Sequence, residues 1–207
     1  MAYRDSARPP TRRIPGLLAP AARRVRGVLV GALRAVFVAI AKALGYRLLR
    51  VPHPGALGEA HGAVFVGTTV FDDGVPAVAN LDPAFLGALR RAAEDAAGDG
   101  IDFVVNSGWR SPAYQDQLLR EAVVKHGSEE EAARWVATAE TSAHVAGGAV
   151  DIGPPAARAW LSVHGAGYGL CQIYENEPWH YELRPDAVVN GCPPMYPDPS
   201  QDPRMRQ

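Results

Sequence analysis

Apolar residues recur every three or four positions in one segment near the middle of the chain, and this spacing predicts an amphipathic helix. The apolar positions are Phe85, Leu86, Leu89, Ala93 and Ala96. Asn80 or Asp82 can cap the start of the helix, and Pro83 suits its first turn. We expect the helix to end at Gly98 or Gly100.

Two more helices are predicted after a short apolar run at Phe103–Val105, which indicates a buried strand. The first of them begins after Ser111, and its apolar positions are Tyr114, Leu118, Leu119, Ala122 and Val123. The second opens at Ser128, whose hydroxyl can cap the helix while Glu131 reaches back. It is predicted to run to about Ala139.

Beyond residue 140 the helical spacing gives way to short apolar runs separated by glycine and proline. Strands are predicted at Val150–Ile152, at Gly169–Tyr174 and at Trp179–Leu183. Because helices come first and strands later, without a regular alternation, the pattern favours the α+β class.

The charges divide the chain into unlike parts. The formal net charge is -1, but residues 1–50 hold ten Arg, one Lys and one Asp, so most of the acidic residues lie in the remainder. We expect a basic and apolar N-terminal segment over 1–50, a folded domain over 51–190 and a disordered tail over 191–207. Nucleic-acid binding is not expected, because the domain is acidic and the basic segment lacks interleaved aromatic residues.

Residues 28–45 are apolar, but Arg34 and Lys42 interrupt them. One interpretation is a signal-anchor whose charged side chains reach the headgroups, with the domain outside the cell membrane in the envelope. A second is an amphipathic helix on an anionic membrane surface. A third is a poorly ordered helix, or a start codon assigned too far upstream, with the domain in the cytoplasm.

Cys171 and Cys192 are the two cysteines of the chain. Two cysteines do not make a disulfide framework, and their spacing does not suit a thiolate zinc site. A single disulfide and a pair of buried free thiols both remain open.

The candidate chemistry begins with His144, which precedes Asp151 by seven residues. Gly147 and Gly148 lie between them and permit a tight turn that can bring the imidazole and the carboxylate together. Asp151 stands in an apolar, strand-like run, where a carboxylate is costly to bury without a cation or hydrogen bonds. A metal ligand pair is therefore one interpretation, and a hydrogen-bonded core pair is the other.

A second candidate segment contains Glu177 and His180, three residues apart, with Pro178 between them. Proline excludes an interior helical position, so we expect a turn or an irregular strand. With His144 and Asp151, His180 supplies two imidazoles and one carboxylate, which leaves a fourth position for water, as in catalytic zinc sites. Glu177 is then the candidate general base. The alternative is a packed aromatic strand with solvated acids.

Arg110 follows the strand predicted at Phe103–Val105 and stands at a strand-to-helix turn. Its guanidinium can stabilise an oxyanion or bind a substrate carboxylate. A surface arginine in a salt bridge is the alternative.

Three motifs in this order resemble the VanY-type D-alanyl-D-alanine carboxypeptidases. They are Ser107–Ser111 (Ser-Gly-aromatic-Arg-Ser), Ser142–Asp151 (Ser-x-His-x-x-Gly-x-Ala-x-Asp) and Glu177–Tyr181 (Glu-x-Trp-His-Tyr). The resemblance covers roughly residues 80–185. It departs from the family at Trp109, where tyrosine is common, and at Val145, where glutamine is common.

The resemblance implies that residues 51–190 form the catalytic domain of a small α+β zinc peptidase, with an antiparallel sheet packed against helices, that hydrolyses peptidoglycan stem peptides. His144, Asp151 and His180 would hold one Zn2+, and Glu177 would be the base and then the acid. Arg110 would stabilise the tetrahedral intermediate, and the implied substrate contacts are Ser107, Gln115 and Ser142. Dipeptidase and endopeptidase activities remain open, as does a non-catalytic zinc-stabilised module that binds cell-wall peptides. Residues 28–45 would supply any membrane association.

Overall fold

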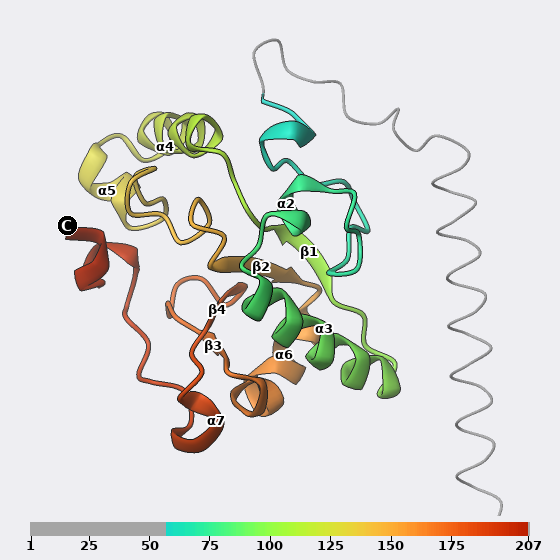
Figure 1. The fold of residues 1–207 in the computed structure, drawn as a ribbon. Coiled ribbons are helices and arrows are strands. Elements are labelled where there is room, and N and C mark those ends of the chain that lie inside the picture. The colour runs from blue at the N-terminus through green and yellow to red at the C-terminus, as the bar shows by residue number, and fades with distance from the viewer. Residues whose placement is uncertain (1–56, 207) are drawn as a thin grey trace, which may run out of the picture. The chain divides into compact units, whose positions relative to one another are not determined.

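The computed structural model describes residues 57–206, which contain one four-stranded sheet with helices packed against it (Figure 1). The strands are β1 (Val104–Ser107), β2 (Ala149–Gly153), β3 (Leu170–Gln172) and β4 (His180–Leu183). Their order is β1-β2-β4-β3, and each neighbouring pair is antiparallel. The predicted α+β class with an antiparallel sheet is therefore confirmed.

The helices are distributed around this sheet (Figure 1). They are α2 (Pro76–Ala79), α3 (Pro83–Gly98), α4 (Pro112–His126), α5 (Glu129–Ala133), α6 (Pro155–His164) and α7 (Ala187–Asn190). The main hydrophobic core joins α3 and α6 to the strands, with Phe85, Leu89 and Leu161 among its buried members. In Figure 1, α4 and α5 lie together near the C-terminus, away from α3 and α6.

The two middle strands, β2 and β4, have one apolar face and one polar face. Val150 and Ile152 of β2 belong to the hydrophobic core, as does Tyr181 of β4. Successive side chains of a strand point to opposite faces, so the residues between these positions point away from the core. One face of the sheet is thus closed by the core, and the other carries Asp151 and His180.

The predicted helix starts are confirmed at three positions. The Asp82 carboxylate accepts hydrogen bonds from the backbone N–H groups of Ala84 and Phe85, both at 2.9 Å. The hydroxyls of Ser111 and Ser128 each accept a backbone N–H bond three residues on, both at 3.2 Å. Such caps satisfy backbone donors that have no partner inside the helix.

Two helices differ from the sequence-based expectation. The α5 helix ends at Ala133 rather than near Ala139, and the Gln115 side chain donates to the carbonyl of Ala137 at 2.8 Å in the stretch that follows. The α6 helix lies between β2 and β3, in a stretch where the sequence-based expectation set no helix bounds. Pro155 occupies its first turn, a position where proline is compatible with a helix.

The C-terminal segment also differs from the expectation of a disordered tail over 191–207. Up to residue 206 it contains two 3-10 helices, η4 (Pro199–Gln201) and η5 (Pro203–Arg206). Tyr196 exchanges backbone hydrogen bonds with Ile173 and Glu175, both at 2.9 Å. Asp202 is fully buried. The segment is therefore a packed part of the domain, held by contacts that a local reading of its Pro- and Asp-rich sequence does not reveal.

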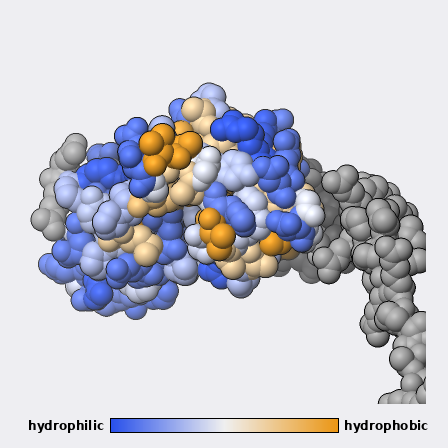
Figure 2. Space-filling view, turned by 90° about the horizontal axis from the view of Figure 1, so that it is seen from below, coloured by the Kyte–Doolittle hydropathy of each residue, from blue (hydrophilic) through white to orange (hydrophobic). Residues whose placement is uncertain are grey.

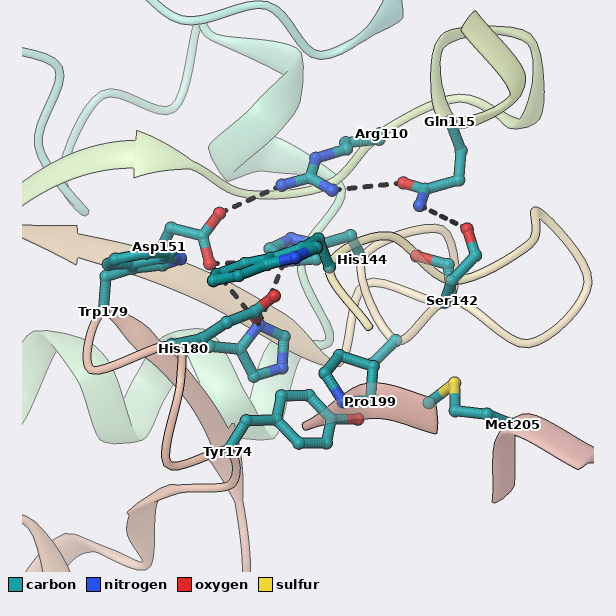
Figure 3. Close-up of a pocket in the computed structure, with 14 residues that line it drawn as sticks. Arg110, Gln115, Ser142, His144, Asp151, Tyr174, Trp179, His180, Pro199 and Met205 are labelled. Carbon is teal, nitrogen blue, oxygen red and sulfur yellow. Dashed lines mark hydrogen bonds and ion pairs between the residues drawn. The ribbon is translucent and has the colours of Figure 1, made fainter. Parts of the chain in front are cut away.

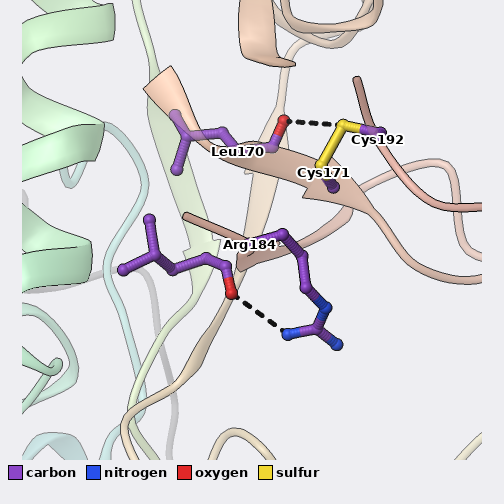
Figure 4. Close-up of a disulfide and its surroundings, with 5 residues drawn as sticks. Leu170, Cys171, Arg184 and Cys192 are labelled. Atoms are coloured by element: carbon purple, nitrogen blue, oxygen red, sulfur yellow. Dashed lines mark hydrogen bonds between the residues drawn. A yellow bond between two sulfur atoms is a disulfide. The ribbon is translucent and has the colours of Figure 1, made fainter. Parts of the chain in front are cut away.

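Cys171 and Cys192 form a disulfide, with their Cα atoms 5.6 Å apart (Figure 4). This settles the alternative that the sequence left open. Cys171 is buried in β3, whereas Cys192 is exposed after α7. The bond therefore attaches the beginning of the C-terminal segment to the edge strand of the sheet.

The basic N-terminal segment 1–50, with its apolar stretch 28–45, lies outside the described residues. None of the helices within 57–206 combines the length and the hydropathy that a membrane span requires. On the face of the molecule shown in Figure 2, apolar residues form separate patches among hydrophilic ones.

The turn between His144 and β2 has the glycine conformation that the sequence suggested. Gly147 has a φ of +74°, and its carbonyl accepts a hydrogen bond from the Asp82 N–H at 2.9 Å. A Cβ atom at Gly147 would lie 2.5 Å from the Asn80 carbonyl oxygen. Both the backbone conformation and the close approach to the start of α3 thus require glycine here.

We expect Gly147→Ala to lower the free energy of unfolding by about 1–3 kcal/mol, because it combines a strained φ with a backbone clash. Urea unfolding followed by circular dichroism measures the change. Gly148→Ala is the matched control, since its added Cβ would meet the Ala143 carbonyl at an ordinary 3.6 Å. Equal stability of the two variants would contradict this account of the turn.

Candidate metal centre

Three buried side chains converge on one point beside the sheet: His144, Asp151 and His180 (Figure 3). His144 Nε2 and His180 Nδ1 are 3.2 Å apart. Each of these two nitrogens lies 3.4 Å from Asp151 Oδ1. The three atoms therefore form a nearly equilateral triangle, and the predicted ligands do come together.

Strand pairing explains why Asp151 and His180 lie together. Asp151 of β2 and His180 of β4 are direct partners in the antiparallel register. Directly opposed residues place their side chains side by side on one face of the sheet. His144 comes from the loop before β2, and its carbonyl accepts a hydrogen bond from the Arg110 N–H at 3.2 Å. That bond and the turn at Gly147 bring the loop over the sheet.

Each imidazole is oriented by a bond from its other nitrogen. His144 Nδ1 is 2.8 Å from the Gly108 carbonyl oxygen, to which it donates, and this leaves Nε2 with a free lone pair. His180 Nε2 is 3.2 Å from Glu182 Oε1, which likewise leaves Nδ1 facing the centre. Metal-binding histidines commonly have such a partner, which fixes the ring and its tautomer.

The triangle fits a zinc ion. With ligand bonds of about 2.0–2.1 Å, tetrahedral geometry places neighbouring ligand atoms about 3.3–3.4 Å apart. The observed separations are 3.2, 3.4 and 3.4 Å. Asp151 Oδ1 is moreover buried without a hydrogen-bond partner among the described residues. A cation among these three atoms would satisfy that oxygen, and two imidazoles with one carboxylate are a common donor set of catalytic zinc.

Glu177 lies at the edge of this triangle. The turn that the sequence predicted around Pro178 is present, because the His180 N–H donates to the Glu177 carbonyl at 3.0 Å. The turn brings Glu177 Oε2 to 3.7 Å from His180 Nδ1. The side chain is buried, and burial raises the pKa of Glu177 to about 7. A carboxyl group with a pKa near neutrality is suited to accepting and returning a proton.

Arg110 contacts the Asp151 carboxylate from the side opposite His180 (Figure 3). Its Nη2 donates to Asp151 Oδ2 at 3.0 Å, and its Nη1 donates to Gln115 Oε1 at 3.2 Å. Its Nε donates to Ser107 Oγ at 2.8 Å. Three fixed bonds hold the guanidinium in place with only 13% of its side chain exposed.

The charges of the centre act on one another. Burial would raise the pKa of Asp151, but His144, His180 and Arg110 together hold it well below its ordinary value. Burial and the Arg110 charge lower the pKa of His144. Burial also disfavours charged His180, but Asp151 and Glu182 outweigh it and raise the pKa of His180 to about 9. The Asp151 and Glu182 carboxylates thus favour positive charge at His180, whereas Arg110 disfavours it at His144.

A pocket of about 200 Å³ opens beside the centre. Its walls include the predicted substrate contacts Gln115 and Ser142, together with Arg110 and Glu177. Ser107, the third predicted substrate contact, instead accepts the bond from Arg110 described above. Its contact in the structure is thus with the arginine.

Sequence reasoning missed several residues of this site. Trp135, Tyr174, Pro199 and Met205 also line the pocket, the last two from the C-terminal segment (Figure 3). Glu182 holds His180 and could have been found, because residues two apart in a strand share a face. Nothing local in the sequence marks Pro199 and Met205, since they reach the pocket only through tertiary packing.

A sheet that presents two imidazoles, a carboxylate and a nearby buried glutamate to a pocket defines a candidate metallohydrolase centre. A family model described as "VanY: D-alanyl-D-alanine carboxypeptidase" matches residues 79–186, which include every residue of the triangle and Glu177. The chain belongs to this family.

A curated relative is a D-alanyl-D-alanine carboxypeptidase of Enterococcus faecalis (strain ATCC 700802 / V583). It is 30% identical over 111 residues, which cover 42% of this chain and 41% of the relative. The chain thus spans less than half of the length of this relative.

Among solved structures, VanYB in complex with D-alanine-D-alanine has a TM-score of 0.49 and 25% identity, covering 54% of this chain and 74% of that one. A Zn(II) complex of a mutant vancomycin resistance D,D-pentapeptidase VanY has a TM-score of 0.47 and 26% identity. It covers 50% of this chain and 72% of that one.

We expect the purified protein to bind one zinc ion per chain and His180→Ala to lose it, because two remaining ligands make a weak site. Metal content by mass spectrometry measures this. His164→Ala is the control, since His164 lies at the end of α6 with its ring 4.5 Å from the Trp160 ring, and the change should leave zinc content unchanged. Full zinc occupancy in His180→Ala would contradict the assignment of this ligand.

Proposed function

We propose that this protein is a zinc-dependent D-alanyl-D-alanine carboxypeptidase that acts on peptidoglycan stem peptides. The observation that carries the proposal is the triangle of His144 Nε2, Asp151 Oδ1 and His180 Nδ1, with buried Glu177 next to it. Family membership supports the same reaction, since the matched stretch contains all four residues.

Zinc held by His144, Asp151 and His180 would supply Lewis acidity, which polarises the scissile carbonyl and lowers the pKa of water. Glu177 accepts the proton of the attacking water and passes it to the leaving amine. Arg110 stabilises the negative charge that develops on the carbonyl oxygen. Its three fixed bonds mean that little reorganisation is required during the reaction.

Ser142 and Gln115 lie in the pocket wall and are the proposed contacts of the terminal D-alanine. Ser107 would contribute by holding Arg110 rather than by direct contact. Carboxypeptidase, dipeptidase and endopeptidase activities differ in the length of peptide on each side of the scissile bond. Product analysis with a stem pentapeptide, with D-alanyl-D-alanine and with a cross-linked dimer distinguishes them, and we expect release of free D-alanine from the pentapeptide.

We also propose that the domain acts in the cell envelope, where its substrate lies. The Cys171–Cys192 disulfide supports this placement, because disulfides persist mainly in oxidising compartments outside the cytoplasm. Anchoring through residues 28–45 stays a prediction, which fractionation of cells that express the full chain tests.

Removal of the metal should abolish release of D-alanine from a pentapeptide ending in D-alanyl-D-alanine, and added zinc should restore it. The reason is that, without the ion, neither the carbonyl nor the water is activated. The assay compares the protein before dialysis against a chelator, after it, and after zinc is returned. Turnover that persists in metal-free protein would overturn the proposed mechanism.

Glu177→Gln should keep bound zinc but lower kcat by about 10²–10⁴-fold, because the amide keeps the shape of the side chain and cannot accept the proton. Parallel measurements of zinc content and kcat separate the two effects. Glu175→Gln is the matched control, since Glu175 is exposed two residues away and should retain wild-type kcat. Peptide binding without turnover in the wild type would instead favour a non-catalytic binding module.

A further inference from the structure

Glu182 occupies a central position behind the metal centre. It lies in β4 two residues after His180, and only 3% of its side chain is exposed. Its Oε1 is 3.2 Å from His180 Nε2, the nitrogen that faces away from the triangle. The direction in which this carboxylate points therefore sets the direction of the His180 lone pair.

Arg204 holds Glu182 from the C-terminal segment. Its Nη1 donates to Glu182 Oε2 at 2.7 Å, and its Nη2 donates to Oε1 at 3.2 Å. A guanidinium fork that engages both oxygens fixes the plane of a carboxylate as well as its position. Arg184 also binds Glu182, but through Oε2 alone, at 2.7 Å.

Asp202 in turn holds Arg204. It accepts from the Arg204 backbone N–H at 2.9 Å and from Nε at 2.9 and 3.0 Å. It also accepts from the Tyr174 hydroxyl at 3.0 Å, and the Tyr174 ring lies 5.1 Å from the His180 ring. The chain of contacts thus begins and ends at His180, and Asp202 within it is fully buried.

We propose that Arg204 is a positioning residue of the metal centre: by locking Glu182, it holds His180 in the orientation that binds zinc. Arg204 lies beyond residue 186, where the family match ends, so the C-terminal segment adds this support to the family's own stretch. The inference rests on the proposed zinc function, and it predicts that part of the zinc affinity depends on a residue 24 positions after the ligand it serves.

Two effects of removing Arg204 have opposite signs. Loss of a positive charge by itself favours a cation nearby, but the Arg204 side chain is 39% exposed, so solvent screens its charge. Loss of orientation weakens the ligand, and partners that orient a metal-binding histidine typically contribute about 10–100-fold to metal affinity. The proposal therefore requires affinity to fall.

The test measures the Kd for zinc of the full chain by competition with a chromophoric chelator. We expect Arg204→Ala to weaken zinc binding by about tenfold or more, toward the range for such partners. Gln201→Ala is the matched control, because Gln201 lies in the same segment but is exposed. It should leave the zinc Kd unchanged.

A double-mutant cycle separates positioning from general loss of structure. Glu182→Gln should weaken zinc binding by itself, and adding Arg204→Ala in that background should change the Kd by less than about threefold, because the route through Glu182 is already broken. Circular dichroism of each metal-free variant verifies that it is folded. If Arg204→Ala is unstable, Arg204→Lys takes its place in the cycle, because lysine keeps the charge but cannot engage both Glu182 oxygens as the guanidinium does, and it should weaken zinc binding as well.

The outcomes distinguish the inference from the function on which it rests. A wild-type chain that binds no zinc would overturn the proposed function. Zinc binding in the wild type with an equal or lower Kd in folded Arg204→Ala would overturn only the inference, as would a full additional loss in the Glu182→Gln background.

Discussion

The buried carboxylate of Asp151 is the constraint on which the site depends. It stands in the middle of β2, between two residues of the hydrophobic core, with 8% of its surface exposed. An uncompensated carboxylate there would cost several kcal/mol. Arg110 compensates one oxygen at 3.0 Å, while the other faces two imidazoles at 3.4 Å and lacks a hydrogen bond among the described residues. The fold thus gives one oxygen an ionic partner, and in the proposed function a divalent cation would serve the other.

The parts of the fold that the sequence predicted are those with local causes. The start of α3 follows from the Asp82 cap and the apolar spacing behind it, and the turn at Gly147 follows from the need for positive φ. The bounds of α6 were not predicted because its proline-rich start resembles a loop. The C-terminal segment was misjudged for a different reason: its order comes from contacts such as the one between Arg204 and Glu182, 22 residues apart, which composition does not encode.

The same distinction applies within the site. His144, Asp151, Glu177 and His180 stand in two short segments whose residue types already indicate metal chemistry, and the β2–β4 pairing explains why the segments meet. The contact of Ser107 could not be predicted from the sequence, because a hydroxyl three residues before an arginine can face either the substrate or the guanidinium. Glu182 is an intermediate case, since strand periodicity places it on the face of His180 but does not say that it is held by two arginines.

If Arg204 orients His180 through Glu182, zinc binding and docking of the C-terminal segment are thermodynamically linked. Any free energy by which the docked segment strengthens zinc binding must equal the free energy by which zinc strengthens docking. The segment also supplies Pro199 and Met205 to the pocket wall, so a docked segment would complete both the ligand geometry and the substrate-facing surface. Its attachment near residue 192 by the disulfide limits how far it can move away, which lowers the entropy lost when it docks. Docking of the C-terminal segment would then favour the zinc-bound state of the domain.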